Sequence, residues 1–251
     1  MESRFNDKVA LITGGGSGIG RAIAPDFAQE GAKVVVVSNV ATEVEEVRTH
    51  VVEAGGECLA ITADVTRLEE VQRFTQAAVA QFGTIDILIN CAGATIEKMV
   101  VDMDPHDWDV VQDVNLKAVF LAGHEIMKIM IQHNFGKIVN IASISGKVSA
   151  ASATGAAYCS SKAGVISLTA VMAAEVKRYD ININALLPAR TNTAMFRKYH
   201  PNYRDVVGLM EPEDIAKVVL FLCSEDARCI KGVAVEVSNG QELLDWDGTE
   251  S

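Results

Sequence analysis

The sequence predicts an α/β fold in which one doubly wound parallel sheet of about seven strands carries helices on both faces. Short runs of β-branched and other apolar residues alternate with longer segments whose apolar residues recur at helical spacing. Several of the short runs are apolar throughout, which is typical of parallel strands buried on both faces. Such alternation implies right-handed strand–helix–strand crossovers.

Each strand is predicted from a short apolar run between turn residues, and each helix from an amphipathic stripe. The predicted strands are Val9–Ile12, Val34–Val37, Cys58–Thr62, Ile85–Ile89, Lys137–Ile141, Ile181–Leu186 and Val233–Val237. The predicted helices are Gly18–Glu30, Ala41–Ala54, Leu68–Phe82, Pro105–Asn134, Tyr158–Tyr179 and Glu213–Cys223. Because no linker or repeat divides the chain, we expect one domain over residues 1–251.

Composition excludes several classes of protein. With 49% hydrophobic residues in 251, the chain can bury a large core. A net charge of −11 argues against nucleic acid and against an anionic membrane surface as partners. No apolar run reaches the roughly 18 residues of a membrane span. The five cysteines are scattered without a CxxC pair, so we expect no metal site and no disulfide framework. With its polar N-terminus, the chain is expected to be cytoplasmic.

A glycine-rich run, Thr13–Gly20, joins the first predicted strand to the first predicted helix. Glycines allow a sharp turn and a close approach of the backbone to a pyrophosphate, and the following helix N-terminus offers free N–H groups. The position after strand one and before helix one is the context that dinucleotide binding requires. The run therefore predicts a dinucleotide site rather than an ordinary turn.

Tyr158 and Lys162 stand four residues apart in a predicted helix, so their side chains share one face. A Tyr has an ordinary pKa of about 10, and a nearby cation lowers it by favouring the phenolate. A proton-transfer phenol is one interpretation of the pair. The other is a chance spacing on a surface helix, which only the rest of the chain can exclude.

Taken together, these motifs resemble the short-chain dehydrogenase/reductase family. The resemblance rests on Thr-Gly-x-x-x-Gly-x-Gly at Thr13–Gly20, Asn90-Cys91-Ala92-Gly93, Asn115, Ser143 and Tyr158-x-x-x-Lys162. It extends from strand one to about Asn239, with the motifs in the family's order. It implies a Rossmann-type fold and hydride transfer with NAD or NADP between a secondary alcohol and a ketone.

The resemblance implies catalytic roles for Asn115, Ser143, Tyr158 and Lys162. Tyr158 would be the general acid/base, and Lys162 would lower its pKa and bind the nicotinamide ribose. Ser143 would hold the substrate oxygen and is preferred to Ser145 because it occupies the family's position before x-x-Gly146. Asn115 would anchor a water that relays protons.

The same resemblance implies the cofactor contacts. Asp64 would meet the adenine amino group beside Val65, while Asn90, Ala92 and Gly93 would shape the floor of the adenosine ribose site. The segment that contains Pro188, Ala189, Thr191 and Thr193 would hold the nicotinamide carboxamide. The predicted cofactor residues are Thr13, Gly14, Gly16, Ser17, Gly18, Ile19, Gly20, Ser38, Asn39, Asp64, Val65, Asn90, Ala92, Gly93, Tyr158, Lys162, Pro188, Ala189, Thr191 and Thr193.

The choice between NAD and NADP is left open by the end of strand two. An Asp or Glu there binds the ribose 2′-hydroxyl and repels a 2′-phosphate, whereas an Arg does the reverse. This chain has Ser38 and Asn39, and Ser17 supplies no cation either. The acid is therefore missing, and no basic residue replaces it.

The substrate is also left open. Residues 194–210 would form a short lid, in which aromatic and basic residues belong either to a pocket for a polar carbonyl or alcohol substrate or to a solvated loop. A 3-oxoacyl-(acyl carrier protein) reductase is an alternative, although the acidic chain lacks a basic cluster before strand five. A non-catalytic nucleotide-binding regulator is a second alternative. Family resemblance further implies a homo-oligomer, a tetramer or a dimer.

Overall fold

Seven parallel strands form one sheet in the computed structural model, which describes residues 3–147, 149 and 153–241. They are β1 (Val9–Thr13), β2 (Lys33–Ser38), β3 (Cys58–Thr62), β4 (Ile87–Asn90), β5 (Gly136–Ile141), β6 (Ile181–Pro188) and β7 (Ala234–Val237). Their order across the sheet is β3-β2-β1-β4-β5-β6-β7. The predicted doubly wound α/β sheet is confirmed. Residues 1, 2 and 242–251 of the predicted domain lie outside the described residues.

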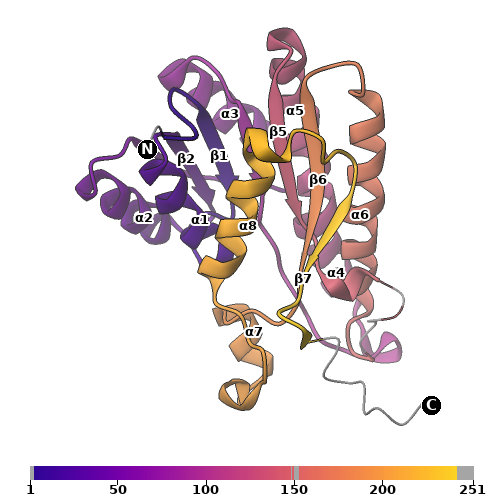
Figure 1. The fold of residues 1–251 in the computed structure, drawn as a ribbon. Helices are drawn as coiled ribbons and strands as arrows, with labels where there is room; N and C mark the ends of the chain where they lie inside the picture. The colour runs from indigo at the N-terminus through magenta and orange to yellow at the C-terminus, as the bar shows by residue number, and fades with distance from the viewer. Residues whose placement is uncertain (1–2, 148, 150–152, 242–251) are drawn as a thin grey trace, which may run out of the picture.

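Helices cover both faces of the sheet (Figure 1). One apolar core joins the sheet to α1 (Gly18–Gln29), α2 (Ala41–Glu53) and α8 (Pro212–Cys223). The other joins it to α3 (Leu68–Phe82), α5 (Ala118–His133) and α6 (Ala156–Glu175). Alternate residues of β1 enter opposite cores, Ile12 the first and Leu11 the second, because side chains alternate across a strand. This explains why Val9–Ile12 of β1 is apolar throughout.

The predicted helix Pro105–Asn134 is wrong as a single element. The segment begins as α4 (Pro105–Gln112), passes through a π-helical turn at Asp113–Lys117, and continues as α5 to His133. The turn is centred on Asn115, whose fully buried amide bonds to residues outside the segment. One residue more per turn lets the side chain reach those partners, and such bulges recur at functional sites.

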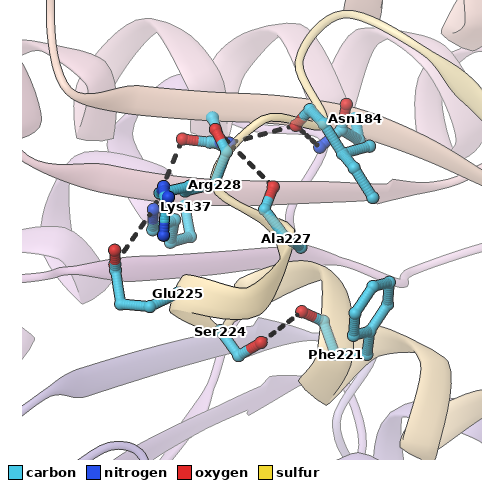
Figure 2. A network of polar contacts seen from close by, with 9 residues as sticks. Lys137, Asn184, Phe221, Ser224, Glu225, Ala227 and Arg228 are labelled. Carbon is cyan, nitrogen blue, oxygen red and sulfur yellow. Dashed lines mark hydrogen bonds and ion pairs between the residues drawn. The ribbon is translucent and has the colours of Figure 1, made fainter.

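A polar network around the buried Lys137 joins β5 and β6 to the connection between α8 and β7 (Figure 2). Lys137 is 1% exposed, and its Nζ lies 3.3 Å from Asn182 Oδ1 and 3.4 Å from Glu225 Oε1. The Asn182 amide donates to the carbonyls of Arg228 and Ile230 at 2.9 and 3.0 Å. These bonds hold the connection at the edge of the sheet where β5 and β6 begin, away from their carboxyl ends.

The strand order reverses between β1 and β4, with β2 and β3 on one side and β5–β7 on the other. Crossovers leave this point in opposite directions, so a crevice forms outside the carboxyl ends of the strands. The short helix α7 (Ala194–Tyr199) follows β6 at that same edge (Figure 1). Within the described residues, no helix combines the length and apolar character that a bilayer span demands.

Candidate active site

A cleft of about 1240 Å³ lies at the carboxyl ends of the strands and collects most of the predicted site residues. It extends from the end of β2 to the loops after β5 and β6. The predicted residues that line it are Gly14, Ser17, Gly18, Ile19, Ser38, Asn39, Asp64, Val65, Ala92, Gly93, Ser143, Tyr158, Lys162, Pro188, Ala189, Thr191 and Thr193.

Five predicted residues are not among those that line the cleft: Thr13, Gly16, Gly20, Asn90 and Asn115. The Thr13 hydroxyl accepts hydrogen bonds from the backbone N–H groups of Cys91 and Ala92, at 3.2 and 3.4 Å. Asn90 donates to Asn140 Oδ1 at 2.8 Å. Their contacts tie the ends of neighbouring strands together, so these polar residues position the wall of the cleft.

The turn from β1 into α1 has the shape of a phosphate cradle. Gly14 adopts φ +65°, and a Cβ on it would lie 2.7 Å from the Cα of Ala92, so only glycine allows this contact. Ser17 precedes α1 without capping it through its side chain. Gly18 and Ile19, the first two residues of α1, line the cleft, and a helix N-terminus of this kind attracts a pyrophosphate. The residues present fit a dinucleotide.

Ser143, Tyr158 and Lys162 meet on the β5 and β6 side of the cleft. Ser143 follows β5, is 7% exposed, and accepts the N–H of Ser145 at 3.1 Å. Tyr158 and Lys162 lie on one face of α6, with Lys162 Nζ 5.6 Å from the centroid of the Tyr158 ring. Lys162 Nζ donates to the Ile141 carbonyl at 2.8 Å. The Ser143 hydroxyl, the Tyr158 phenol and the Lys162 ammonium therefore lie close together in the cleft.

The expected lowering of the Tyr158 pKa by Lys162 is not found. Burial raises the pKa of the phenol, and a hydrogen bond with Ser143 acts in the opposite direction. Burial also lowers the pKa of Lys162, to about 8. The Lys162 ammonium donates to the Ile141 carbonyl rather than to the phenol oxygen. Burial is therefore the main cause of the pKa shift in both groups. Ser145 also lines the cleft, but Ser143 is the serine that forms a hydrogen bond with Tyr158. The geometry therefore favours Ser143 as the partner of the phenol.

Asn115 connects the two sides of the site. Its Oδ1 accepts the Ala94 N–H at 2.7 Å, and its Nδ2 donates to the Ala94 carbonyl and to Ser161 Oγ, both at 2.9 Å. Ala94 follows β4, and Ser161 lies next to Lys162 on α6. The side chain therefore holds the loop after β4 against the helix that carries Tyr158.

The segment of the predicted lid is anchored at both of its ends. Thr193 caps α7 by accepting the Phe196 N–H at 3.2 Å, and the Tyr199 hydroxyl donates to the Thr95 carbonyl at 3.0 Å. Gln241 accepts the Arg190 N–H at 3.0 Å and donates to the carbonyls of Arg190 and Gly208, at 3.1 and 2.7 Å. The predicted lid thus lies against the cleft.

Sequence reasoning missed Ser161 and Gln241. Ser161 stands inside the Tyr-x-x-x-Lys run, and its partner Asn115 was already singled out, so the signal was the pairing of two buried polar residues. Gln241 gave no signal, because its partners are backbone groups brought near by the fold.

The chain is similar in sequence to known dehydrogenases and reductases. The sequence matches the family model for short chain dehydrogenase over residues 8–204. It is 37% identical to (3R)-3-hydroxyacyl-CoA dehydrogenase of Canis lupus familiaris, covering 94% of this chain and 97% of that protein. It is 33% identical to 3-oxoacyl-[acyl-carrier-protein] reductase FabG of Thermotoga maritima, covering 94% of this chain and 98% of that protein.

A solved structure agrees in fold. The crystal structure of levodione reductase superposes with a TM-score of 0.90 at 33% sequence identity, covering 96% of this chain and 99% of that chain. Fold, cleft and sequence match agree over nearly the whole chain. The protein belongs to the short-chain dehydrogenase/reductase family and is an oxidoreductase of that family.

Proposed function

We propose that the protein interconverts a secondary alcohol and a ketone with NAD or NADP, using Tyr158 as the general acid/base. The observation that carries the proposal is the meeting of Ser143, Tyr158 and Lys162 in one cleft with a glycine-rich phosphate cradle. A binding module has no chemical need for this combination. An oxidoreductase does, because the substrate oxygen gains or loses a proton as the carbon gains or loses a hydride.

The cofactor supplies or accepts the hydride at its nicotinamide ring. The turn at Gly14–Gly18 would hold its pyrophosphate, Asp64 and Val65 its adenine, and Lys162 its nicotinamide ribose. Thr193 is positioned at the start of α7, where it would bind the carboxamide.

Tyr158 would give its proton to the carbonyl oxygen during reduction and take the hydroxyl proton during oxidation. Its raised pKa keeps the phenol protonated at neutral pH, which suits the donor role. Ser143 would donate a hydrogen bond to the same oxygen and stabilise the developing negative charge. Lys162, with a pKa of about 8, carries its charge at neutral pH and would stabilise the phenolate left behind.

A 3-hydroxyacyl or 3-oxoacyl thioester is the second candidate substrate. It is favoured by the activities for which the canine and Thermotoga relatives are named. Arg190, which lines the cleft after β6, offers a cation for an acidic group of such a substrate. The net charge of −11 disfavours docking of an acidic carrier protein, so a small thioester is preferred.

The experiment is a panel of ketones, secondary alcohols and 3-hydroxyacyl thioesters, read as nicotinamide absorbance with both cofactors. We expect Tyr158→Phe to lose about 10²- to 10⁴-fold in turnover while retaining cofactor binding. Tyr179→Phe removes the same hydroxyl outside the cleft and is the matched control. Undiminished turnover in Tyr158→Phe contradicts the assignment. Cofactor binding without turnover on any substrate favours the regulator instead.

A further inference from the structure

A carboxylate lies at the end of the cleft where the adenosine would bind, although the residue that ends β2 is not acidic. Strand β2 ends at Ser38, the position where an acid would select NAD. Glu43, five residues further on, lines the same cleft. A Cβ placed on Gly16 would lie 2.8 Å from Glu43 Oε2 and 3.1 Å from the Cβ of Ser38. The Glu43 carboxylate therefore lies over the glycine-rich turn, beside the residue that ends β2.

Local packing holds Glu43 in this place. It belongs to the first turn of α2, which is anchored by Val44 and Val47, 1% and 2% exposed. The Ser38 hydroxyl accepts the Val40 N–H at 3.4 Å and so takes part in the turn between β2 and α2. The absence of a side chain at Gly16 leaves the space that the carboxylate occupies. The first turn of α2 thus directs an acid to the cleft.

The charged side chains that line the cleft near the end of β2 are all negative among the described residues. The described residues that line it between β2 and the loop after β3 include the carboxylates of Glu43 and Asp64 and no Lys or Arg. Arg21 on α1 is paired with Glu46, with Nη1 and Oε2 3.0 Å apart. The cations that do line the cleft belong to the segments after β5 and β6 and to α6.

We propose that Glu43 is the specificity-determining residue for the cofactor and makes the protein prefer NAD(H) to NADP(H). Its carboxylate accepts hydrogen bonds from the adenosine ribose hydroxyls and repels a 2′-phosphate, which carries about −1.5 to −2 charges at pH 7. The inference rests on the proposed dinucleotide function and replaces the missing acid of β2 with one from α2.

The test is isothermal titration of NADH and NADPH into the wild type, Glu43→Gln and Glu53→Gln. Glu53 lies at the end of the same helix, ten residues or about 15 Å further along, so its substitution changes net charge equally but outside the screening length of about 8 Å. In the wild type, NADH should bind at least about tenfold more tightly than NADPH. In Glu43→Gln this ratio should fall about fivefold or more, chiefly through tighter NADPH binding, because a charge repulsion is removed.

Salt gives a second readout that does not depend on turnover. Raising the NaCl concentration from about 0.05 to about 0.5 M should narrow the ratio in the wild type and in Glu53→Gln, and much less in Glu43→Gln. A wild type that prefers NADPH, or an unchanged ratio in Glu43→Gln, overturns the inference and leaves dinucleotide binding intact. Failure of both nucleotides to bind the wild type overturns the proposed function together with it.

Discussion

Replacing Asn115 with Ala tests whether one buried amide holds the two sides of the cleft together. The side chain is fully buried and makes three hydrogen bonds, two with the Ala94 backbone and one with Ser161 Oγ. The substitution leaves each of these partners without its bond. It also removes the contacts that accompany the π-helical turn at Asp113–Lys117.

The expected cost follows from the exposure of the partners. A hydrogen bond contributes about 1 kcal/mol net, and a buried group left unpaired costs about 1–3 kcal/mol. Ala94 is half-buried, so its backbone groups regain some contact with water. The Ser161 hydroxyl is buried but keeps its bond to the Tyr158 carbonyl at 2.7 Å. We therefore expect Asn115→Ala to lower the free energy of unfolding by about 3–4 kcal/mol, near the low end for three unpaired groups.

The assay is urea unfolding followed by circular dichroism at one fixed protein concentration. Ser161→Ala should cost about 1 kcal/mol alone, and the double variant should cost about 1 kcal/mol less than the two single costs combined, since both remove one shared bond. A loss below about 1 kcal/mol for Asn115→Ala, or strictly additive costs in the double variant, would refute the view that the amide joins Ala94 to α6.

Two further predictions concern the same cleft. Since the pKa of Lys162 is lowered to about 8 from an ordinary 10.5, the folded state binds fewer protons than the unfolded state, and the stability cost of this lysine shrinks as pH rises. The unfolding free energy of the wild type relative to Lys162→Met should thus rise by about 1 kcal/mol between pH 7 and 9 in urea titrations, and a fall would contradict the assigned direction. Gly14→Ala should lower the free energy of unfolding by at least about 2 kcal/mol more than Gly55→Ala does, and it should abolish NADH binding. Both glycines have a positive φ, but a Cβ at Gly14 would collide with Ala92, whereas a Cβ at Gly55 would meet nothing within 4 Å. Equal losses of stability, with NADH binding retained in Gly14→Ala, would show that the contact with Ala92 does not matter.

The fold was largely predictable because its signals are local. A strand buried on both faces is largely apolar, so the runs Val9–Ile12 in β1 and Val34–Val37 in β2 stand out from the sequence alone. The boundaries of β4 differ from prediction by one or two residues. The long helix was wrong at Asn115, because the cause of the π-helical turn lies in contacts with Ala94 and Ser161, 21 and 46 residues away. Periodicity within a segment carries no information about such partners.

By itself, the sequence determined the parts of the site that depend on spacing along one element. Tyr158 and Lys162 share a helix face because helical geometry requires it, and the glycine-rich run turns sharply because its glycines lack a Cβ. Only the tertiary structure decided what these groups face. Burial, which arises when α6 packs against β6 and the turn Ile144–Gly146 after β5, raises the pKa of Tyr158 where the sequence suggested a lowering. The Glu43 carboxylate lies beside Ser38 and Gly16 because three separate segments converge at the ends of the strands, a proximity that no spacing in the chain expresses.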